Sequence, residues 1–414
     1  MTVTVGRRHV ERSVRRGRLA VAALTVVLAA ACSTTPPAAA PVAAPAELSP
    51  DTVRRDVDVA GQRLAAVADR LPPAAYPVRT GPDGAWVTTP ATDWTSGFFA
   101  GSLWRMYALT RDPVWRARAE ARQAGVEPAK LDDSSHDIGF QILDTFGQDA
   151  DLTGDPRARD VVLTAAATLA TRYNPAVGAF RSWDERDDTK RFQVIMDNMM
   201  NLELMFWASA HGGDPRWAQM AATHARTTAR DFFRPDGGSW HVVNYDQRSG
   251  AVIRKYTEQG FADDSTWSRG EAWAIHGFTT SYRYTGDPQF LATARAAADY
   301  FLAHLPPDQV PYWDFSLPGT DGQPRDSSAG AVAASGLLEL GRLEPDPVRG
   351  RGDVDATRRI LAGLSSPSYL SGDGSQAVLL HGTQNAPEGN ADTGLVFGDY
   401  YFLEALGAVG PLTS

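Results

Sequence analysis

Apolar residues recur at helical spacing through most of the chain from about residue 51 onward. Near residues 51–71, one side of the predicted helix carries Val53, Val57, Leu64, Val67 and Leu71. Further along, a more apolar helix is repeatedly followed by an Ala- and Arg-rich amphipathic one, as in residues 193–210 and 215–233. Only residues 239–245 and 252–256 have a strand pattern, typical of a hairpin on a loop. The pattern therefore predicts an almost wholly helical chain.

A short repeated sequence separates the two helices of a pair. It is Gly-Asp-Pro at residues 154–156, 213–215 and 286–288, and Arg-Asp-Pro at 111–113. Glycine can end one helix, aspartate can cap the next, and proline fits its first turn. The pattern gives about twelve helices in six hairpins, each with a buried inner and a solvated outer member. We expect an all-α fold, an (α/α)6 barrel of six helical hairpins. An open helical solenoid is the alternative, and closure is favoured because neither terminal helix has an obviously polar capping face.

The first fifty residues have the composition of an export segment. Residues 1–32 predict a lipoprotein-type signal peptide, because an arginine cluster precedes an apolar run at 19–31 that is shorter than the ~20 residues of a membrane span. The run ends at Cys32, the single cysteine, which we expect to be lipidated; no intramolecular disulfide can form. Residues 33–50 form the predicted Ala/Pro-rich tether, and the predicted barrel spans residues 51–414. We expect an exported protein, either a membrane-anchored cell-surface lipoprotein or a secreted one, and the pair Arg15-Arg16 leaves twin-arginine export open.

Charge and motifs exclude several classes of protein. The formal net charge of −9 over 414 residues argues against nucleic acid as a partner. The sequence has no Gly-rich phosphate loop and no G-x-S-x-G nucleophile elbow. Its 8 histidines lack the close paired spacing of zinc proteases.

Two apolar helices are predicted to begin at a carboxylate. Asp197 and Asn201 lie one turn apart in the apolar stripe of residues 194–206, and Asn198 is adjacent. The second carboxylate, Asp137, follows His136 at the start of another apolar helix. A carboxylate among apolar residues is costly to bury unless it is paired or functional. These two positions predict a cleft with acid/base chemistry. We expect the neighbouring amides to orient the Asp197 carboxyl and partial burial to raise its pKa. Partly exposed helix-start aspartates are the alternative.

The loops that lead into the apolar helices are rich in residues that bind sugars. The chain has 11 tryptophans, and about half lie in these loops, where a flat indole face suits a pyranose ring. Arg269 lies among them, and its planar guanidinium suits a carboxylate. An ion pair of Arg269 with Glu271 or Asp264 is the alternative.

Several of these segments together resemble the unsaturated glucuronyl hydrolases, glycoside hydrolase family 88, from about residue 51 to 406. The matching segments are DWTSGFF, SHDIGF, MDNMMN, GGSWHVV, EQGFADDSTWSRGEAW, DSSAGAVAASGLLEL and GDYYFLEAL. The resemblance implies an (α/α)6 barrel that releases a 4,5-unsaturated uronate from the non-reducing end of lyase-generated oligosaccharides. It implies Asp197 as general acid/base and Asp137 as a second essential carboxylate. The implied substrate-binding positions are His136, Trp94, Trp183, His241, Gln259, Arg269 and Trp273.

The implied reaction is hydration of a vinyl ether: Asp197 protonates C4, and water then adds at C5. This reaction implies no metal and no organic cofactor. Members that prefer sulfated disaccharides carry basic and hydroxyl residues before the last helix, whereas here residues 381–390 contain no Lys or Arg, so we expect a preference for unsulfated substrates. Two other functions remain open, an unsaturated rhamnogalacturonyl hydrolase and a non-catalytic surface glycan-binding lipoprotein. The oligomeric state is left open.

Overall fold

Helices make up about half of the described chain, residues 47–183 and 191–410 of a computed structural model, and several of them begin at a capping aspartate. At each repeated Asp-Pro, the aspartate side chain accepts a hydrogen bond from a backbone N–H two residues on, as Asp155 does from Arg157 at 2.8 Å. Gly154 and Gly286 end the preceding helices at φ of 75° and 66°, which glycine adopts without strain. The local chemistry predicted for the helix junctions is therefore present.

The helices, in chain order, are α1 (Pro50–Arg70), α2 (Ser96–Thr110), α3 (Pro113–Gln123), α4 (Ile138–Ile142), α5 (Gln148–Thr153), α6 (Pro156–Ala170), α7 (Asn198–Ala210), α8 (Pro215–Asp231), α9 (Ser268–Thr285), α10 (Pro288–Ala303), α11 (Ser327–Leu343), α12 (Pro347–Leu364) and α13 (Val396–Val409). Two short 3-10 helices are η1 (Glu127–Leu131) and η3 (Ala386–Glu388). The π-helical turn η2 (Leu143–Gly147) joins α4 to α5, so the three form one continuous element.

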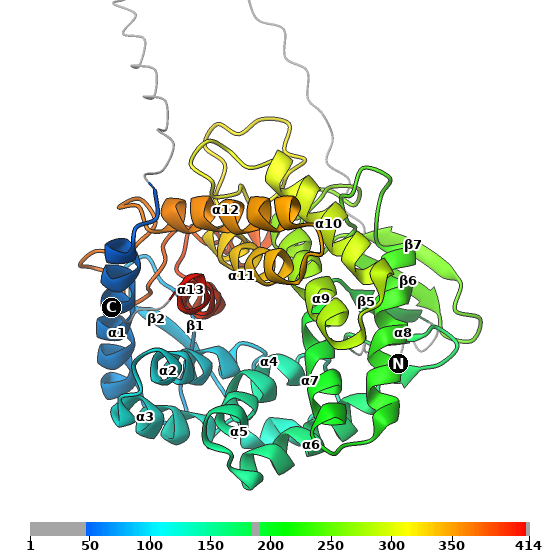
Figure 1. The fold of residues 1–414 in the computed structure, drawn as a ribbon, viewed down its shortest axis with the longest axis horizontal. Helices are drawn as coiled ribbons and strands as arrows, with labels where there is room; N and C mark the ends of the chain where they lie inside the picture. Colours follow the sequence, from blue (N-terminus) through cyan, green and yellow to red (C-terminus); the bar gives the residue numbers. More distant parts are fainter. Residues whose placement is uncertain (1–46, 184–190, 411–414) are drawn as a thin grey trace, which may run out of the picture. The chain divides into compact units, whose positions relative to one another are not determined.

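Six elements form an inner ring, and the remaining long helices cover it (Figure 1). In chain order the inner elements are α2, α4–η2–α5, α7, α9, α11 and α13, and each packs on the next. The ring closes because α13 packs against α2. The predicted (α/α)6 barrel is confirmed, and the open solenoid is excluded.

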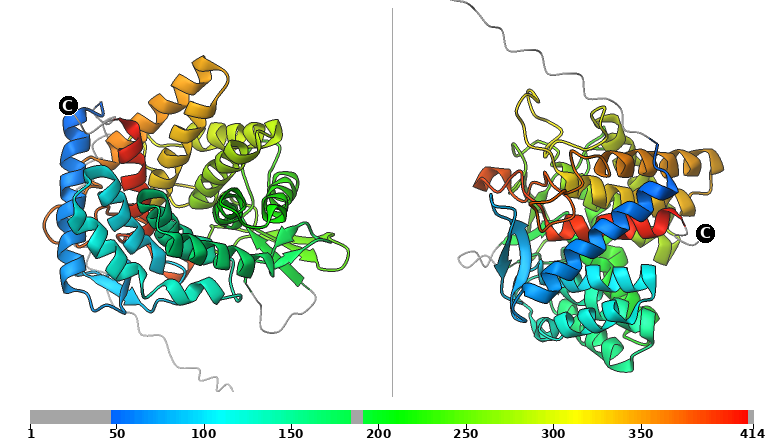
Figure 2. Two further views of the ribbon diagram at one scale, coloured as in Figure 1. Left: turned by 60° about the horizontal axis from the view of Figure 1, so that its bottom comes forward. Right: turned by 90° about the vertical axis from the view of Figure 1, so that its left-hand side faces the viewer.

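Seven short antiparallel strands lie in the loops of the described chain: β1 (Tyr76–Thr80), β2 (Trp86–Thr89), β3 (Tyr173–Asn174), β4 (Ala179–Phe180), β5 (Arg191–Ile195), β6 (Val242–Asp246) and β7 (Val252–Tyr256). The predicted hairpin is present as β6–β7, and β5 pairs with β6, placing Ile195 opposite Val242. Figure 2 shows this sheet beside the helices. The prediction of a helix from residue 193 was wrong, because Val194 and Ile195 are β-branched and pair in β5 before α7 begins.

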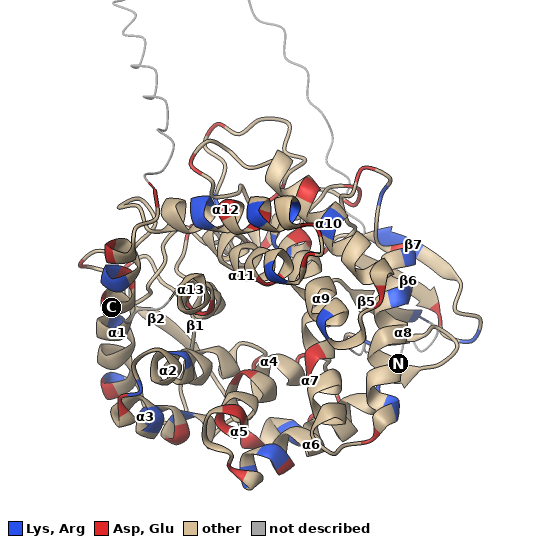
Figure 3. Cartoon of the chain, in the orientation of Figure 1, with Lys and Arg blue, Asp and Glu red and all other residues tan. Residues whose placement is uncertain are grey.

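Charged residues lie mainly on the outer helices, with acidic positions also inside the ring on α5 and α7 (Figure 3). Within residues 47–183 and 191–410, none of the helices combines the length and apolar character that a membrane crossing requires. The predicted signal peptide, Cys32 and nearly all of the predicted tether lie outside the described residues.

Candidate active site

Asp137 and Asp197 occupy the N-cap positions of α4 and α7, but among the described residues neither carboxylate accepts a capping hydrogen bond from its own helix. The outer helices differ, since their N-cap aspartates do cap, as Asp155 shows. The positive end of a helix dipole favours a negative charge at this position. Both carboxylates are therefore held near helix ends and remain available for other contacts.

The first carboxylate, Asp197, is buried beside His241. Its Oδ2 lies 3.5 Å from His241 Nε2, and among the described residues neither atom has a partner in hydrogen-bonding geometry. Burial raises the pKa of Asp197, but His241 foremost, then His136 and Arg269, outweigh it, so this pKa lies below its ordinary value. Asp197 is therefore an ionised carboxylate whose Oδ2 is available for a new contact. The sequence-based expectation that burial would raise this pKa was wrong, because it neglected the nearby imidazoles.

The second carboxylate, Asp137, shows the opposite shift. Its Oδ2 accepts a hydrogen bond from Ser135 Oγ at 2.7 Å, and its Oδ1 lies 3.4 Å from His136 Nε2. Burial raises the pKa of Asp137, and the charges of Asp197 and Asp93 add to that effect, while His136 and Ser135 oppose it. Asp137 therefore holds a proton more readily than Asp197 does.

Asn201 connects the two carboxylate positions. Its Oδ1 accepts the backbone N–H of Phe140 at 2.9 Å, which fixes the orientation of the amide. Its Nδ2 then donates to His136 Nδ1 at 3.2 Å and to the backbone oxygen of Asp197 at 3.3 Å. Burial lowers the pKa of His136, so the ring is neutral and carries its proton on Nε2, facing Asp137.

His241 is oriented in a similar way. The backbone N–H of Glu258 donates to His241 Nδ1 at 3.3 Å, so in the neutral ring the proton lies on Nε2, toward Asp197. The ring packs at 4.5 Å, between centroids, on Trp267. Each carboxylate thus has one imidazole Nε2 directed at it.

Asn198 does not orient the Asp197 carboxylate, although its position next to that residue had suggested this role. Its Oδ1 accepts hydrogen bonds from Ser182 Oγ at 2.5 Å and from the backbone N–H of Ile195 at 3.1 Å. Because Ser182 immediately precedes Trp183, Asn198 positions the loop that carries this tryptophan.

The three predicted tryptophans lie around this site in different environments. Trp183 is half-buried, with its ring centroid 6.3 Å from that of His136. Trp94 and Trp273 both pack on Phe140, with ring centroids 5.7 and 5.5 Å away. Trp273 is fully buried, and its Nε1 has no hydrogen-bond partner in the described part of the chain. These rings form an apolar wall with one free donor.

Arg269 forms an ion pair that neither sequence-based alternative named. Its Nη1 lies 2.8 Å from Asp326 Oδ2, and its Nη2 donates to the backbone oxygen of Gln384 at 2.6 Å. Gln259 donates to the same oxygen at 2.9 Å. Glu271 does not pair with Arg269, because it accepts two hydrogen bonds from Ser239. Arg269 and Gln259 therefore both fix the loop at Gln384, and Arg269 Nε remains without a partner among the described residues.

The structure thus brings His136, Asp137, Asp197 and His241 together and connects Arg269 with Gln259. Asp326 and Arg79 were not predicted from the sequence. The only signal for Asp326 was its N-cap position before Ser327-Ser328. Arg79 lies near the same loop, with its Nη1 3.4 Å from Gln384 Oε1. Within the described ranges, no group of three or more His, Cys, Asp or Glu residues could hold a metal ion.

Comparisons with known proteins agree with this arrangement. The model of glycosyl hydrolase family 88 matches residues 78–338. An unsaturated glucuronyl hydrolase of Formosa agariphila is 44% identical over 323 residues, covering 77% of this chain and 80% of the relative. That of Bacillus sp. (strain GL1) is 35% identical, covering 84% and 93%. The crystal structure of an unsaturated glucuronyl hydrolase specific for heparin matches with a TM-score of 0.85 at 36% identity, covering 88% of this chain and 100% of the other.

The family match spans more than half of the chain, and the relatives match over most of their own length. Sequence, fold and comparison therefore lead to one conclusion: this chain belongs to glycoside hydrolase family 88.

Proposed function

We propose that this enzyme releases 4,5-unsaturated uronic acid from the non-reducing end of lyase-generated oligosaccharides by hydrating the C4=C5 double bond. The observation that carries the proposal is the pair of carboxylates, Asp137 and Asp197, each facing an imidazole Nε2 at the start of an inner helix. The relatives from Formosa and Bacillus carry the corresponding name, unsaturated glucuronyl hydrolase.

The first step is proton transfer from Asp197 to C4. The π electrons of the double bond form the new C–H bond, and the positive charge is shared by C5 and the ring oxygen. Asp197, now ionised, removes a proton from the water that adds to C5. The hemiketal opens to a C5 ketone, and the hemiacetal left at C1 collapses to an aldehyde as the remaining sugar departs. Each assisted proton transfer contributes roughly 10²–10⁴ in rate.

Substrate binding has to bring Asp197 to its protonated form. Without a ligand the pKa of Asp197 is below its ordinary value because the imidazole of His241 faces it. A bound uronate adds a negative charge and excludes water, and both effects raise the pKa of a carboxyl group. Asp137, whose pKa is already raised by burial, fits a role in holding the substrate through a shared proton.

The uronate carboxylate needs donors near C5. We propose that the unpartnered Nε of Arg269 and the indole Nε1 of Trp273 supply them, since both are buried without a partner in the part of the chain that the structure describes. The Nη groups of Arg269 hold Gln384 and Asp326, so this arginine would also fix the loop before α13 against the substrate.

A preference for unsulfated disaccharides is proposed from the same loop. Residues 383–390 contain Glu388 and no cation, and a sulfate without a charged partner forgoes roughly 1.5–3 kcal/mol for each missing hydrogen bond. The structure also brings the cation Arg79 to this loop, through its contact with Gln384.

A substrate panel tests both statements. Loss of the ultraviolet absorbance of the conjugated double bond should follow addition of enzyme to unsulfated unsaturated disaccharides. A chain that bound these sugars but left the absorbance unchanged would be a glycan-binding protein, and the proposed reaction would be wrong. A higher kcat/KM on a sulfated disaccharide than on its unsulfated counterpart would refute the preference. If Arg79→Gln then lost the higher kcat/KM on the sulfated disaccharide, sulfate binding would be assigned to Arg79.

Export as a lipoprotein anchored through Cys32 is also proposed. It is supported by the arginine cluster, the short apolar run and the Ala/Pro-rich segment that follows the cysteine.

A further inference from the structure

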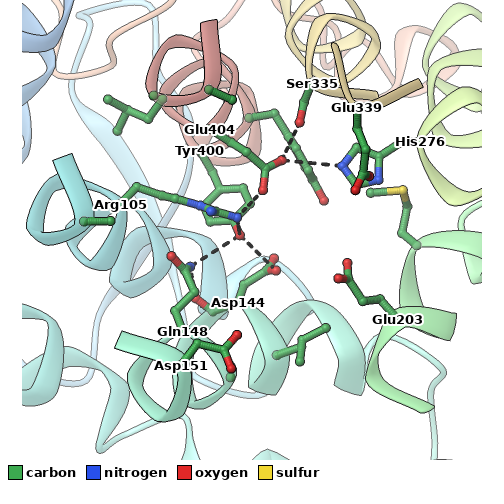
Figure 4. A pocket seen from close by; sticks show the side chains of 18 of the residues that line it. Arg105, Asp144, Gln148, Asp151, Glu203, His276, Ser335, Glu339, Tyr400 and Glu404 are labelled. Atoms are coloured by element: carbon green, nitrogen blue, oxygen red, sulfur yellow. Dashed lines mark hydrogen bonds and ion pairs between the residues drawn. The ribbon is translucent and has the colours of Figure 1, made fainter. Parts of the chain in front are cut away.

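A cavity lies inside the ring, toward the ends of the inner helices that are remote from Asp137 and Asp197. Its volume is about 620 Å³, within the range of small-molecule sites. Its polar lining residues lie further along the same helices, for example Asp144 in η2, seven residues after Asp137, and Glu203 on α7, six residues after Asp197 (Figure 4). The proposed reaction uses none of them.

A layer of aromatic rings lies between this cavity and the candidate active site. Phe140 lines the cavity and packs against Trp94 and Trp273, with centroids 5.7 and 5.5 Å away. Tyr401 also lines the cavity and packs on Trp273 at 5.4 Å. The two sites therefore share an aromatic wall but are lined by different polar residues.

Carboxyl groups outnumber cations in the cavity. Among its described lining residues the acids are Asp144, Asp151, Glu203, Glu339 and Glu404, and the basic residues are Arg105, Arg283, Arg342 and His276, whose pKa Glu404 raises against the opposing effect of burial. Figure 4 shows the carboxyl groups of Asp144, Glu203, Glu339 and Glu404 around one central space.

The arginines do not form ion pairs with every carboxyl group in the cavity. Arg105 pairs with Glu404, which also accepts from Ser335 Oγ at 2.6 Å and lies 3.5 Å from His276. Arg283 pairs with Glu203 and, at 2.8 Å, with Glu339. Asp144 forms no ion pair within the described chain.

Asp144 lacks both an ion pair and, for one carboxyl oxygen, a hydrogen-bond partner among the described residues. It lies in the π-helical turn η2, a distortion that is frequent at functional sites. The hydroxyl of Tyr400 donates to its Oδ1 at 3.1 Å, whereas its Oδ2 is buried without a hydrogen-bond partner among the described residues. Burial and the nearby Glu404 raise the pKa of Asp144 well above its ordinary value, as expected where negative charge is not compensated.

We propose that this cavity is a second ligand site and that its ligand carries a protonated amino group. An ammonium group placed between Asp144 and Glu203 would donate to Asp144 Oδ2 and would balance the excess of carboxylates. The rings of Tyr400, Tyr401 and Trp207 line the same space, and the guanidinium of Arg105 already lies over the ring of Tyr400, 5.1 Å from its centroid. An anionic ligand would meet the same carboxylates and be repelled.

Calorimetric titration of the full chain tests the site. The cationic probes are ethanolamine and glucosamine at about pH 6.5, where such amines are largely protonated. N-acetylglucosamine is the neutral control with the same ring. We expect both amines to bind, and glucosamine to bind at least ~10-fold more tightly than N-acetylglucosamine, as the loss of a charged hydrogen bond implies.

Variants locate the binding. Asp144→Asn and Glu203→Gln should each weaken glucosamine binding at least ~10-fold. Asp321→Asn, which removes the same charge from an exposed residue outside the cavity, should leave it unchanged. Near-ultraviolet circular dichroism confirms that each variant is folded.

Three results would overturn the proposal. The first is that neither amine binds, and the second is that N-acetylglucosamine binds as tightly as glucosamine. The third is that Asp197→Asn abolishes amine binding while folded Asp144→Asn and Glu203→Gln retain it, which would place the amine in the active site.

Discussion

Asp197 and Asp137 carry the same functional group, yet their neighbours shift their pKa values in opposite directions. His241 lies 3.5 Å from Asp197 and keeps it ionised, whereas burial dominates at Asp137. Two carboxylates with separated pKa values are typical of acid/base sites. We therefore assign proton transfer to Asp197 and substrate holding to Asp137.

Asp197→Asn keeps the shape of the side chain and removes both proton transfers. We expect at least a ~10³-fold loss in kcat, or about 4 kcal/mol. Asp137→Asn should also be severely impaired. Steady-state kinetics measure both, and an unchanged melting temperature shows that folding is intact. An Asp197→Asn enzyme that retained a tenth of the wild-type kcat would exclude it as the acid/base.

His241→Gln tests how the protonation of Asp197 is set. Its imidazole helps to hold the pKa of Asp197 below the ordinary value, so removing it should raise that pKa. The reaction begins with protonated Asp197, whose fraction falls as pH rises through its pKa. The descending limb of the kcat/KM profile should therefore move to higher pH. A limb that stays in place, or moves to lower pH, would show that another group supplies the proton.

At the scale of elements, the buried pair Arg269–Asp326 joins the start of α9 to the start of α11 and to the loop before α13. Asp326→Asn leaves a capping oxygen for α11 but removes the charge opposite a buried guanidinium. We expect about 3 kcal/mol lower stability and a higher KM, because the loop at Gln384 is released. Urea denaturation and kinetics measure the two effects.

Asp287→Asn is the matched control, since it changes the cap of the outer helix α10, where the aspartate pairs with Arg226 near the surface. It should alter stability little and KM not at all. Equal losses in stability and KM for the two variants would contradict the role of the Arg269–Asp326 pair in positioning the loop.

Local signals in the sequence predicted the helical hairpins but did not predict the contacts between them. The Gly-Asp-Pro junctions predicted the helix ends, because capping depends on neighbouring residues alone. The helical period failed at Val194 and Ile195, where pairing with β6 decides the structure. Asp326 and Arg79 were missed because their partners, Arg269 and Gln384, are remote in sequence. The positions of Asp137 and Asp197 were predictable because both combine a helix start with an apolar helix.

For the whole molecule, attachment to a membrane remains a prediction from residues 1–50. Cys32→Ser should move the protein from the membrane fraction to the soluble fraction, because a lipid anchor supplies ~0.8 kcal/mol for each buried methylene. Cell fractionation with immunoblotting measures this. A wild-type protein that is already fully soluble after processing at another residue would refute the lipoprotein assignment.

The order of bond changes is the central claim about the enzyme, and isotope incorporation tests it most directly. The reaction is run in water enriched in ¹⁸O and, separately, in deuterated water, and the product is analysed by mass spectrometry and NMR. Hydration predicts ¹⁸O at C5 of the keto-acid and deuterium at C4. Ordinary displacement would instead place ¹⁸O on the anomeric carbon of the released uronate and leave C4 unlabelled, and that result would contradict the mechanism.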